Sequence, residues 1–169
     1  MTERGLRSDE GASRSLHPSC VRVNEIVEAA GIAGRVRILP EAAPTAQSAA
    51  DQVGVEVGAI ANSLIFRTAS DQPLLVMTSG AHRVDTKVVA PLIGEKIGRA
   101  DADFVRRHTG QPIGGVAPVG HPAPITTLID EDLAQFPELW AAGGIPHAVF
   151  PLTFDELVAL TGGTVTRVA

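Results

Sequence analysis

The chain has 169 residues and a formal net charge of −5, and 44% of its residues are hydrophobic. This length predicts one domain with a substantial core, and the acidic balance disfavours a protein that coats nucleic acid in bulk, while leaving room for a local basic patch. No apolar run approaches the roughly 20 residues of a membrane span, and the single cysteine, Cys20, excludes an internal disulfide and is consistent with a cytoplasmic protein.

Residues 1–18 are expected to form a disordered N-terminal extension. They carry charges without a helical or strand period, and they lack the apolar stretch of a secretory signal. The folded domain is therefore expected to span residues 19–169 as one unit, because neither a repeat nor a linker divides it.

The first half of the domain is predicted to contain two helices and three strands. Apolar residues recur with a helical period before Gly31, and Thr45 and Gly54 are a cap and a stop for the second helix. The stretch "TASDQ" between two apolar runs is typical of a hairpin turn. In chain order the predicted elements are a helix at 20–31, a strand at 35–39, a helix at 45–54, and strands at 62–67 and 73–79.

The second half continues this mixture. Asp85 is a cap for a helix that Pro91 limits, and an aspartate and Gly110 bound the next helix. The predicted elements are helices at 86–94, 101–110, 131–136 and 153–162, and strands at 96–100, 125–130, 137–142, 143–152 (after a turn) and 164–168. Strands outnumber helices without strict alternation, so we predict an α/β (mixed α+β) fold with a mixed, barrel-like sheet and surrounding helices.

The common cofactor and nucleophile motifs are missing from the sequence. There is no phosphate-binding P-loop and no G-x-S-x-G elbow, and "GQPIGGVAPVG" does not have the Rossmann spacing. The histidines are scattered without a metal-binding spacing, so we predict neither a metal nor a cofactor. Asp130 and Glu131 start a short helix, where helix capping is the simplest role for them.

The most unusual segment is "TGQPIGGVAPVGHPAP", residues 109–124, which we call the Gly/Pro segment. Its glycines and prolines exclude an ordinary helix or central strand. Such a loop presents backbone N–H groups to a carbonyl or carboxylate, or it is only a structural corner between strands. Composition alone leaves both readings open.

A second unusual feature is the polar pair Asn62 and Ser63 at the start of an apolar strand. Neighbouring side chains of a strand point to opposite faces. One of the two should therefore face the interior, where an unpaired polar group costs about 1–3 kcal/mol. The pair predicts either a buried hydrogen bond or the floor of a pocket.

The order of several segments resembles the YbaK/EbsC family over about residues 20–169. The segments are "TAQSAADQVGVEVGAIANSLIFR", "PLLVMTSGAHRVDTKVVAPLIG", "RADADFVRRHTGQPIGGVAPVGHP", "TLIDEDL" and "AAGGIPHAVFPLTFDELVALTGG". This family is similar to the editing domain inserted in bacterial prolyl-tRNA synthetase. The resemblance implies that the chain hydrolyses mischarged aminoacyl-tRNA in trans, without a metal or an enzyme nucleophile, with a ribose hydroxyl and a water as the usual participants.

The resemblance also implies where the site lies. Asn62 stands where typical members carry a lysine, and Ser63 keeps their hydroxyl position, while Asp130 matches an acidic position after a later strand. Asn62, Gly115 and Asp130 are therefore the expected catalytic residues. The expected substrate-binding residues are Ser63, Thr78, Ser79, Gly80, Gly110, Gly114, Val116, Pro118, His121 and His147. The expected tRNA contacts are Arg67, Arg83, Lys87 and Arg107.

Three functions follow as alternatives. The first is trans-editing of mischarged tRNA bound by its acceptor end, with an aminoacyl-tRNA synthetase as a further partner, by a cytoplasmic monomer or homodimer that does not bind membranes. The second is a non-catalytic relative that binds a tRNA end or a small aminoacyl-like ligand; it is favoured by Asn62, because an amide lacks the fixed charge of lysine and is not a general base. The third is an interaction protein that reuses the fold.

Overall fold

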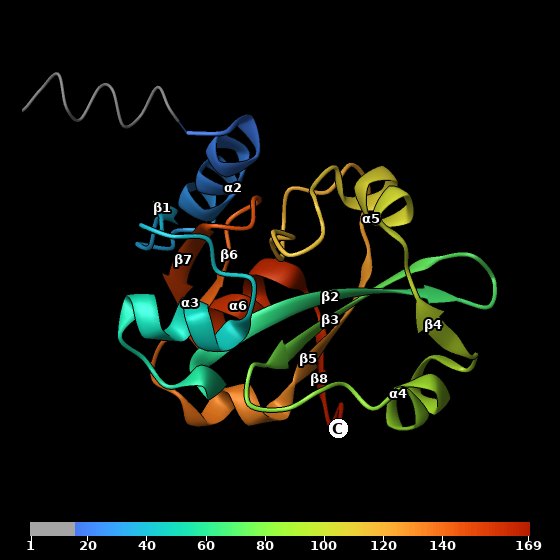
Figure 1. Ribbon diagram of the computed structural model, residues 1–169. Coiled ribbons are helices and arrows are strands. Elements are labelled where there is room, and N and C mark those ends of the chain that lie inside the picture. Colours follow the sequence, from blue (N-terminus) through green and yellow to red (C-terminus); the bar gives the residue numbers. More distant parts are fainter. Residues whose placement is uncertain (1–15) are drawn as a thin grey trace, which may run out of the picture.

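The structure is a computed structural model, and it describes residues 16–169. One mixed eight-stranded sheet carries helices on its outside (Figure 1), so the predicted α/β (mixed α+β) class is confirmed. Most of the expected N-terminal extension lies outside the described residues, and Pro18 already begins the first helix. Among residues 16–169, no helix combines the length and the apolar character needed to cross a membrane.

The sheet has the strand order β1-β7-β6-β2-β3-β5-β8, and β4 pairs with β2 off this path. The β2–β6, β3–β5 and β5–β8 ladders are parallel and the other four are antiparallel. The ladder is an open path, since no pairing among the described strands joins β1 to β8. The strands are β1 (Arg37–Ile38), β2 (Ile60–Thr68), β3 (Pro73–Ser79), β4 (Ile97–Arg99), β5 (Thr126–Asp130), β6 (Leu139–Ala142), β7 (Ala148–Leu152) and β8 (Thr164–Thr166).

Local sequence explains where the helices begin and end. Capping boxes around Thr45 and Thr153 start α3 and α6, aspartates cap α4 and α5, and a left-handed glycine ends each of these four helices. The helices are α2 (Pro18–Ala29), α3 (Ala46–Val53), α4 (Thr86–Ile93), α5 (Ala102–Thr109) and α6 (Phe154–Thr161), with 3₁₀ turns η1 (Val57–Ala59) and η2 (Glu131–Gln135). The short helix predicted at 131–136 is thus a 3₁₀ helix.

Helices cover both faces of the sheet. One face, which we call the α2 face, packs against α2 and α6 in a core that includes Val23, Met77 and Leu157. The opposite face, which we call the α3 face, packs against α3 through residues such as Ala50 and against α4 through Val89. Two separate helices on one face leave a strip of the sheet between them, and the candidate site begins there.

A gap along β2 is the feature of the fold that creates the site. β6 pairs with β2 only at Ile60 and Ala61, and β4 pairs with it only over residues 66–68. Residues 62–65 therefore have a strand partner on the β3 side alone. In the view of Figure 1 the Gly/Pro segment and α5 lie above this stretch of β2, and α4 lies below it.

Some backbone N–H and C=O groups of β2 point into the gap along its free edge. The C=O of Ile60 and the N–H of Thr68 make hydrogen bonds on the β3 side. Because alternate residues of a strand direct their backbone groups to opposite edges, the N–H and C=O groups of Ser63 and Ile65 point towards the gap. Polar backbone at an uncovered edge is ready to pair with a ligand.

Candidate functional site

A groove follows the free edge of β2, and we call it the β2 groove. It has a small branch of about 140 Å³ towards β6 and α3, and a large branch of about 490 Å³ towards β4 and α5. The residues common to both branches are Pro44, Asn62, Ser63, Gly114 and Val116. A separate cleft of about 450 Å³ between α4 and the ends of β5 and β8 holds none of the predicted site residues.

Asn62 and Ser63 divide their roles between the two faces. Ser63 points to the α2 face, where its hydroxyl donates to the Met77 sulfur at 3.2 Å. Asn62 lies on the α3 face, is exposed, and makes no side-chain hydrogen bond within residues 16–169. Of the pair, Asn62 is thus the side chain that is free to bind a ligand.

The Gly/Pro segment covers the groove with backbone. Gly114 is exposed at φ +86°, a left-handed conformation that favours glycine, and a Cβ there would point into open space. Within the described part of the chain, the backbone N–H groups of Gly114 and Val116 have no hydrogen-bond acceptor. Both residues line the junction of the branches, and their amides are unpaired among the described residues.

Gly115 has a different reason to be a glycine. A Cβ at Gly115 would come within 2.4 Å of the Ile145 carbonyl carbon and 2.6 Å of the Pro146 nitrogen. The residue is buried in a contact between two loops, and it lines neither branch. The structure thus places Gly115, which the resemblance implies is catalytic, against the loop after β6 and outside the groove lining.

A buried glutamine holds the Gly/Pro segment in shape. Gln111 is 2% exposed; its Nε2 donates to the C=O of Val119 at 3.1 Å, and its Oε1 accepts from the N–H of Ala117 at 2.7 Å. Thr109 adds hydrogen bonds to the backbone of Gln111. This clamp orders a segment that has no regular secondary structure, so its free amides are presented in a defined arrangement.

Asp130 lies on the same face as Asn62 but in a closed environment. It is 1% exposed and accepts hydrogen bonds from the Ser79 N–H at 2.9 Å and the Asp132 N–H at 3.0 Å. His82 bridges two carboxylates, with Nε2 2.5 Å from Asp130 and Nδ1 3.5 Å from Asp132. These three side chains have potential ligand atoms within 4.8 Å of one another, and each ring nitrogen of His82 faces a different carboxylate, so the imidazole lies between the two acidic side chains.

The remaining predicted substrate-binding residues lie outside the groove lining. Thr78 and Ser79 are buried at the end of β3, and a Cβ on Gly80 would lie 2.5 Å from the Val57 C=O. Gly110 is the C-cap of α5. The last three, Pro118, His121 and His147, lie in or beside loops and line neither branch.

His121 has a structural environment of its own. Its Nε2 lies 2.8 Å from the Ala117 C=O, to which it donates. Burial lowers the pKa of the His121 imidazole from its usual value, the hydrogen bond to Ala117 opposes this, and the nearby Arg22 adds to it. The ring thus holds the Gly/Pro segment through Ala117 and does not line the groove.

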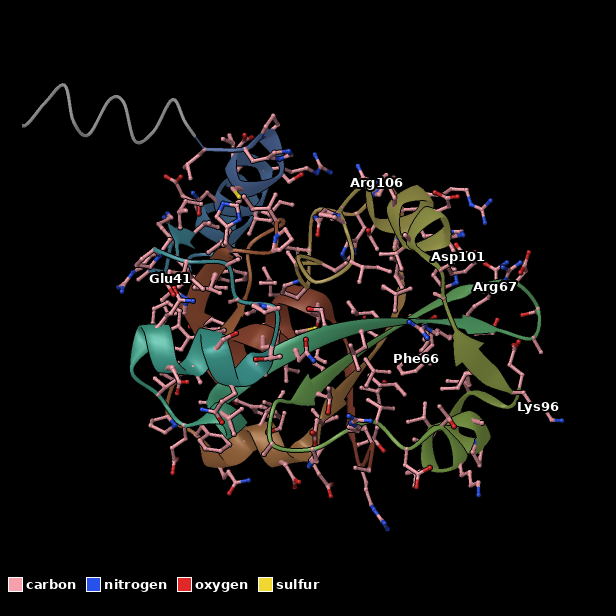
Figure 2. All side chains as sticks on the ribbon, viewed as in Figure 1. Glu41, Phe66, Arg67, Lys96, Asp101 and Arg106 are labelled. Carbon is pink, nitrogen blue, oxygen red and sulfur yellow. The ribbon has the colours of Figure 1, made fainter. Side chains whose placement is uncertain are left out.

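The predicted tRNA-contact residues fall into two groups. Arg67 pairs with Asp71, and both Arg67 and Arg107 stack over the Phe104 ring, at 5.1 and 5.5 Å from its centroid. Figure 2 shows Arg67 near the hairpin end of β2, far from Glu41 at the opposite end of the molecule. Arg83 and Lys87 are exposed around the start of α4, whose Thr86 lines the large branch.

Comparison with known proteins assigns the chain to a family. The sequence profile described as "Aminoacyl-tRNA editing domain" matches residues 40–160. The chain belongs to the aminoacyl-tRNA editing domain family. Its function is accordingly aminoacyl-tRNA editing, and its substrate is an aminoacyl-tRNA.

Individual relatives agree with this membership. The chain is 33% identical to the uncharacterized protein YwhH of Bacillus subtilis (strain 168), over 67% of this chain and 72% of that protein. It is 24% identical to "Putative Cys-tRNA(Pro)/Cys-tRNA(Cys) deacylase EbsC" of Enterococcus faecalis, over 70% of this chain and 73% of the other. A crystal structure described as "a putative trans-editing enzyme for prolyl tRNA synthetase" matches with a TM-score of 0.85 and 43% identity, over 91% of this chain and 98% of that one.

Within this editing domain the groove lining is unusual for an enzyme. Among the described residues, Arg99 is the only charged side chain that lines either branch, and no histidine, aspartate, glutamate or lysine does. The Ser63 hydroxyl donates its hydrogen bond to the Met77 sulfur and not to a base that could activate it as a nucleophile. The arrangement is suited to holding and polarising an ester rather than to proton transfer by a side chain.

Several groove residues carry no signal that sequence reasoning detected. The segment around Pro44, which reads as a plain loop, forms one wall. Trp140 lies within a predicted strand, and Ile113 is the exposed apolar tip of the Gly/Pro segment. Arg99 was one of several scattered arginines. Only the tertiary arrangement brings these residues together.

Proposed function

We propose that the chain hydrolyses the ester bond of a mischarged aminoacyl-tRNA in trans. The supporting observation is the junction of the β2 groove, which is lined by the exposed Asn62 and by Gly114 and Val116, whose N–H groups have no acceptor among the described residues. Donors of this kind stabilise the oxyanion that forms when an ester is attacked. The cleft between α4 and the ends of β5 and β8 has none of these residues in its lining.

The two branches suit the two sides of the ester. The amino acid occupies the small branch, because about 140 Å³ excludes a nucleoside. The terminal adenosine occupies the large branch, where Phe66, Val105 and Ile113 provide apolar surface for a base. Arg99 at the rim of this branch contacts a phosphate of the acceptor end.

The chemical step then depends on the substrate's own groups. A water oxygen adds to the ester carbon, the bond from that carbon to the ribose oxygen breaks, and the ribose oxygen leaves with a proton. Asn62 donates to the ester carbonyl or orients the water, and the loop amides stabilise the charge that develops. The neighbouring ribose hydroxyl relays the proton, since none of the side chains that line the groove within residues 16–169 is a carboxylate, histidine or lysine.

The descriptions of two relatives indicate a substrate and a partner. The relative EbsC is described as acting on Cys-tRNA, and the matched crystal structure is described as an enzyme for prolyl tRNA synthetase. We therefore propose a prolyl-tRNA that carries a small wrong amino acid, with its synthetase as a partner. One competing function is that the chain binds the acylated end of the tRNA without hydrolysis. Asn62 favours this function, because it replaces the charged lysine of typical members with a neutral amide.

A deacylation assay tests the proposal. The purified chain is incubated with tRNAs carrying different small amino acids, and the loss of the aminoacyl ester is followed. We expect hydrolysis of at least one of them, and a decrease of about 10- to 100-fold for Asn62→Ala, with thermal stability unchanged because Asn62 is exposed.

A tRNA that ends in 2′-deoxyadenosine is the matched control for the relay. It should bind with similar affinity and be hydrolysed much more slowly. Tight binding of an acylated tRNA without hydrolysis of any member of the panel would instead support the non-catalytic function. Full activity of Asn62→Ala would remove Asn62 from the mechanism.

A further inference from the structure

Five consecutive residues of β2, residues 62–66, line the large branch of the β2 groove. Neighbouring side chains of a strand point to opposite faces, and here Ile65 packs against the core of the α2 face while Phe66 packs against the cluster around α4 on the α3 face. Residues from both faces share only the strand edge. The large branch therefore runs along the backbone edge of β2, and Phe66, labelled in Figure 2, lies towards its hairpin end.

Three backbone groups on this edge have no partner in the sheet. Even-numbered residues of β2 direct their backbone groups to β3, so Ser63 and Ile65 direct theirs to the branch. The Ile65 C=O adjoins the ladder to β4, which starts at Phe66, and this leaves the Ser63 N–H, the Ser63 C=O and the Ile65 N–H. Within the described part of the chain, no backbone group of the Gly/Pro segment bonds to them. Along the edge they present a donor, an acceptor and a donor.

The rest of the large branch is suited to a flat, neutral ring system. Its volume is about 490 Å³, and Phe66, Val105 and Ile113 supply apolar surface. Stacking on such surface is tolerant of the base, because every base has a π-face. The identity of an unstacked base is instead read by hydrogen bonds to its edges, and the free edge of β2 provides both a donor and an acceptor for this.

We propose that the edge of β2 selects adenine as the terminal base of the substrate. The Ser63 C=O accepts from the exocyclic amine of adenine, and the Ile65 N–H donates to the ring nitrogen beside that amine. The Ser63 N–H lies on the side of Asn62, where the ester is placed. This inference rests on the proposed function, which puts the terminal adenosine in the large branch. Hypoxanthine and guanine carry a carbonyl oxygen in place of the amine, so two acceptors would face each other at Ser63.

A binding measurement with matched probes tests the inference on the wild type. The probes are 3′-amino-3′-deoxyadenosine with alanine attached through a stable amide, and the same compound with inosine as the nucleoside. The two differ only in the hydrogen-bonding groups of the base, so stacking is nearly the same. We expect the adenosine probe to bind about 10- to 100-fold more tightly, the factor that an unpaired polar group supports. Equal affinities would overturn the inference.

A backbone variant tests the assigned donor. Ile65→Pro removes the N–H that faces the branch and leaves the ladder to β3 intact, and proline is tolerated at strand edges. Ile65→Val is the matched control, since it keeps the N–H and most of the packing. The preference for the adenosine probe should fall several-fold in Ile65→Pro and persist in Ile65→Val. A folded Ile65→Pro protein with the preference of the parent would overturn the inference, and if this variant does not fold, the wild-type comparison decides.

Deacylation separates failure of this inference from failure of the proposed function. The substrates are one mischarged tRNA that ends in adenosine and the same tRNA that ends in inosine, both well below the KM. Tighter binding of the adenosine probe supports the inference even if neither ester is hydrolysed, in which case the proposed function fails. Hydrolysis of both tRNAs at equal rates would overturn the inference, while the proposed function would stand.

Discussion

Two polar side chains on the α3 face are in opposite states. Asn62 pairs across the ladder with Thr78, and Thr78 lies beside Asp130, so the three residues form one row across β2, β3 and β5. Asp130 is buried, and both of its carboxylate oxygens accept hydrogen bonds, while Asn62 is exposed and unpaired among residues 16–169. A fully paired buried carboxylate stabilises the end of β3, and an unpaired amide at a groove remains available to a ligand.

The glycines of the Gly/Pro segment repeat this contrast. Gly114 needs its left-handed backbone and has open space around it. Gly115 needs the absence of a side chain, because another loop occupies the position. Adjacent and chemically identical residues are therefore required for different reasons, one at the groove and one in the packing.

The largest effect is expected from removing the Asp130 carboxylate. Asp130→Ala leaves the Ser79 N–H buried and unpaired and takes a carboxylate away from His82. Because the Ser79 and Asp132 N–H groups both lose their acceptor, we expect a loss of about 2–4 kcal/mol in the free energy of unfolding, measured by urea denaturation. Asp132→Asn, at a half-exposed position, is the control and should cost less than about 1 kcal/mol. An Asp130→Ala protein that is as stable as the parent but inactive would instead support the catalytic role predicted from the sequence.

The two glycines give a second test with different readouts. Gly115→Ala forces a Cβ against the Ile145 backbone, so we expect a loss of about 1–3 kcal/mol in stability together with reduced activity. Gly114→Ala carries only the backbone strain of its φ, about 1–2 kcal/mol, but places a methyl group in the groove and should reduce deacylation at least tenfold. Gly94→Ala has a similar φ of +77° and open space, so it should reproduce the strain without the loss of activity. If Gly114→Ala and Gly94→Ala are equally active, the loop is only a corner.

The fold was largely predictable because its signals are local. Caps such as Thr45 and stops such as Gly54 act within one helical turn, and these two residues begin and end α3 as predicted. The pair at 62–63 likewise predicted opposite faces for its side chains. The sequence order of these elements and the family resemblance were enough to predict a mixed sheet with outer helices.

The site was less predictable because it depends on which strand edges remain unpaired. Nothing near Ser63 in the sequence indicates that β6 and β4 leave a gap there. The burial of Asp130 and the space around Gly114 are likewise set by segments distant in the chain. Sequence reasoning therefore predicted Asn62 and the Gly/Pro segment, which line the groove, but it did not predict Trp140 or Arg99, which line it because of their neighbours in space.

Charge reversals extend the comparison to Arg67 and Arg99, which lie on the paired strands β2 and β4 at the hairpin end of β2. Arg99→Glu should raise the KM for aminoacyl-tRNA several-fold and make the salt dependence of binding shallower by about one phosphate contact, because Arg99 lines the large branch. Arg67→Glu should change neither, since Arg67 already pairs with Asp71 away from the groove. Both variants should hydrolyse a minimal aminoacyl-adenosine as the parent does. An effect of Arg67→Glu equal to that of Arg99→Glu would restore Arg67 as the tRNA contact predicted from the sequence.

The smallest effect concerns pH and the far side of the Gly/Pro segment. Burial holds the pKa of His121 below its usual value of about 6.5, so the unfolded chain binds a proton at this residue more readily than the folded chain does. The free energy of unfolding should therefore fall as the pH decreases from about 6.5 to the lowered pKa of His121 in the folded chain. Above about pH 6.5, His121 should contribute no pH dependence. His121→Gln keeps a donor for the Ala117 C=O but does not titrate, so its unfolding free energy should fall less than that of the parent between about pH 6.5 and 5. His108→Gln, at a ring on the outer side of α5 beside Phe104, is the control. If the pH profiles of His121→Gln and the parent coincide, the folded chain does not disfavour protonation of His121, and the ring does not hold the Gly/Pro segment through Ala117.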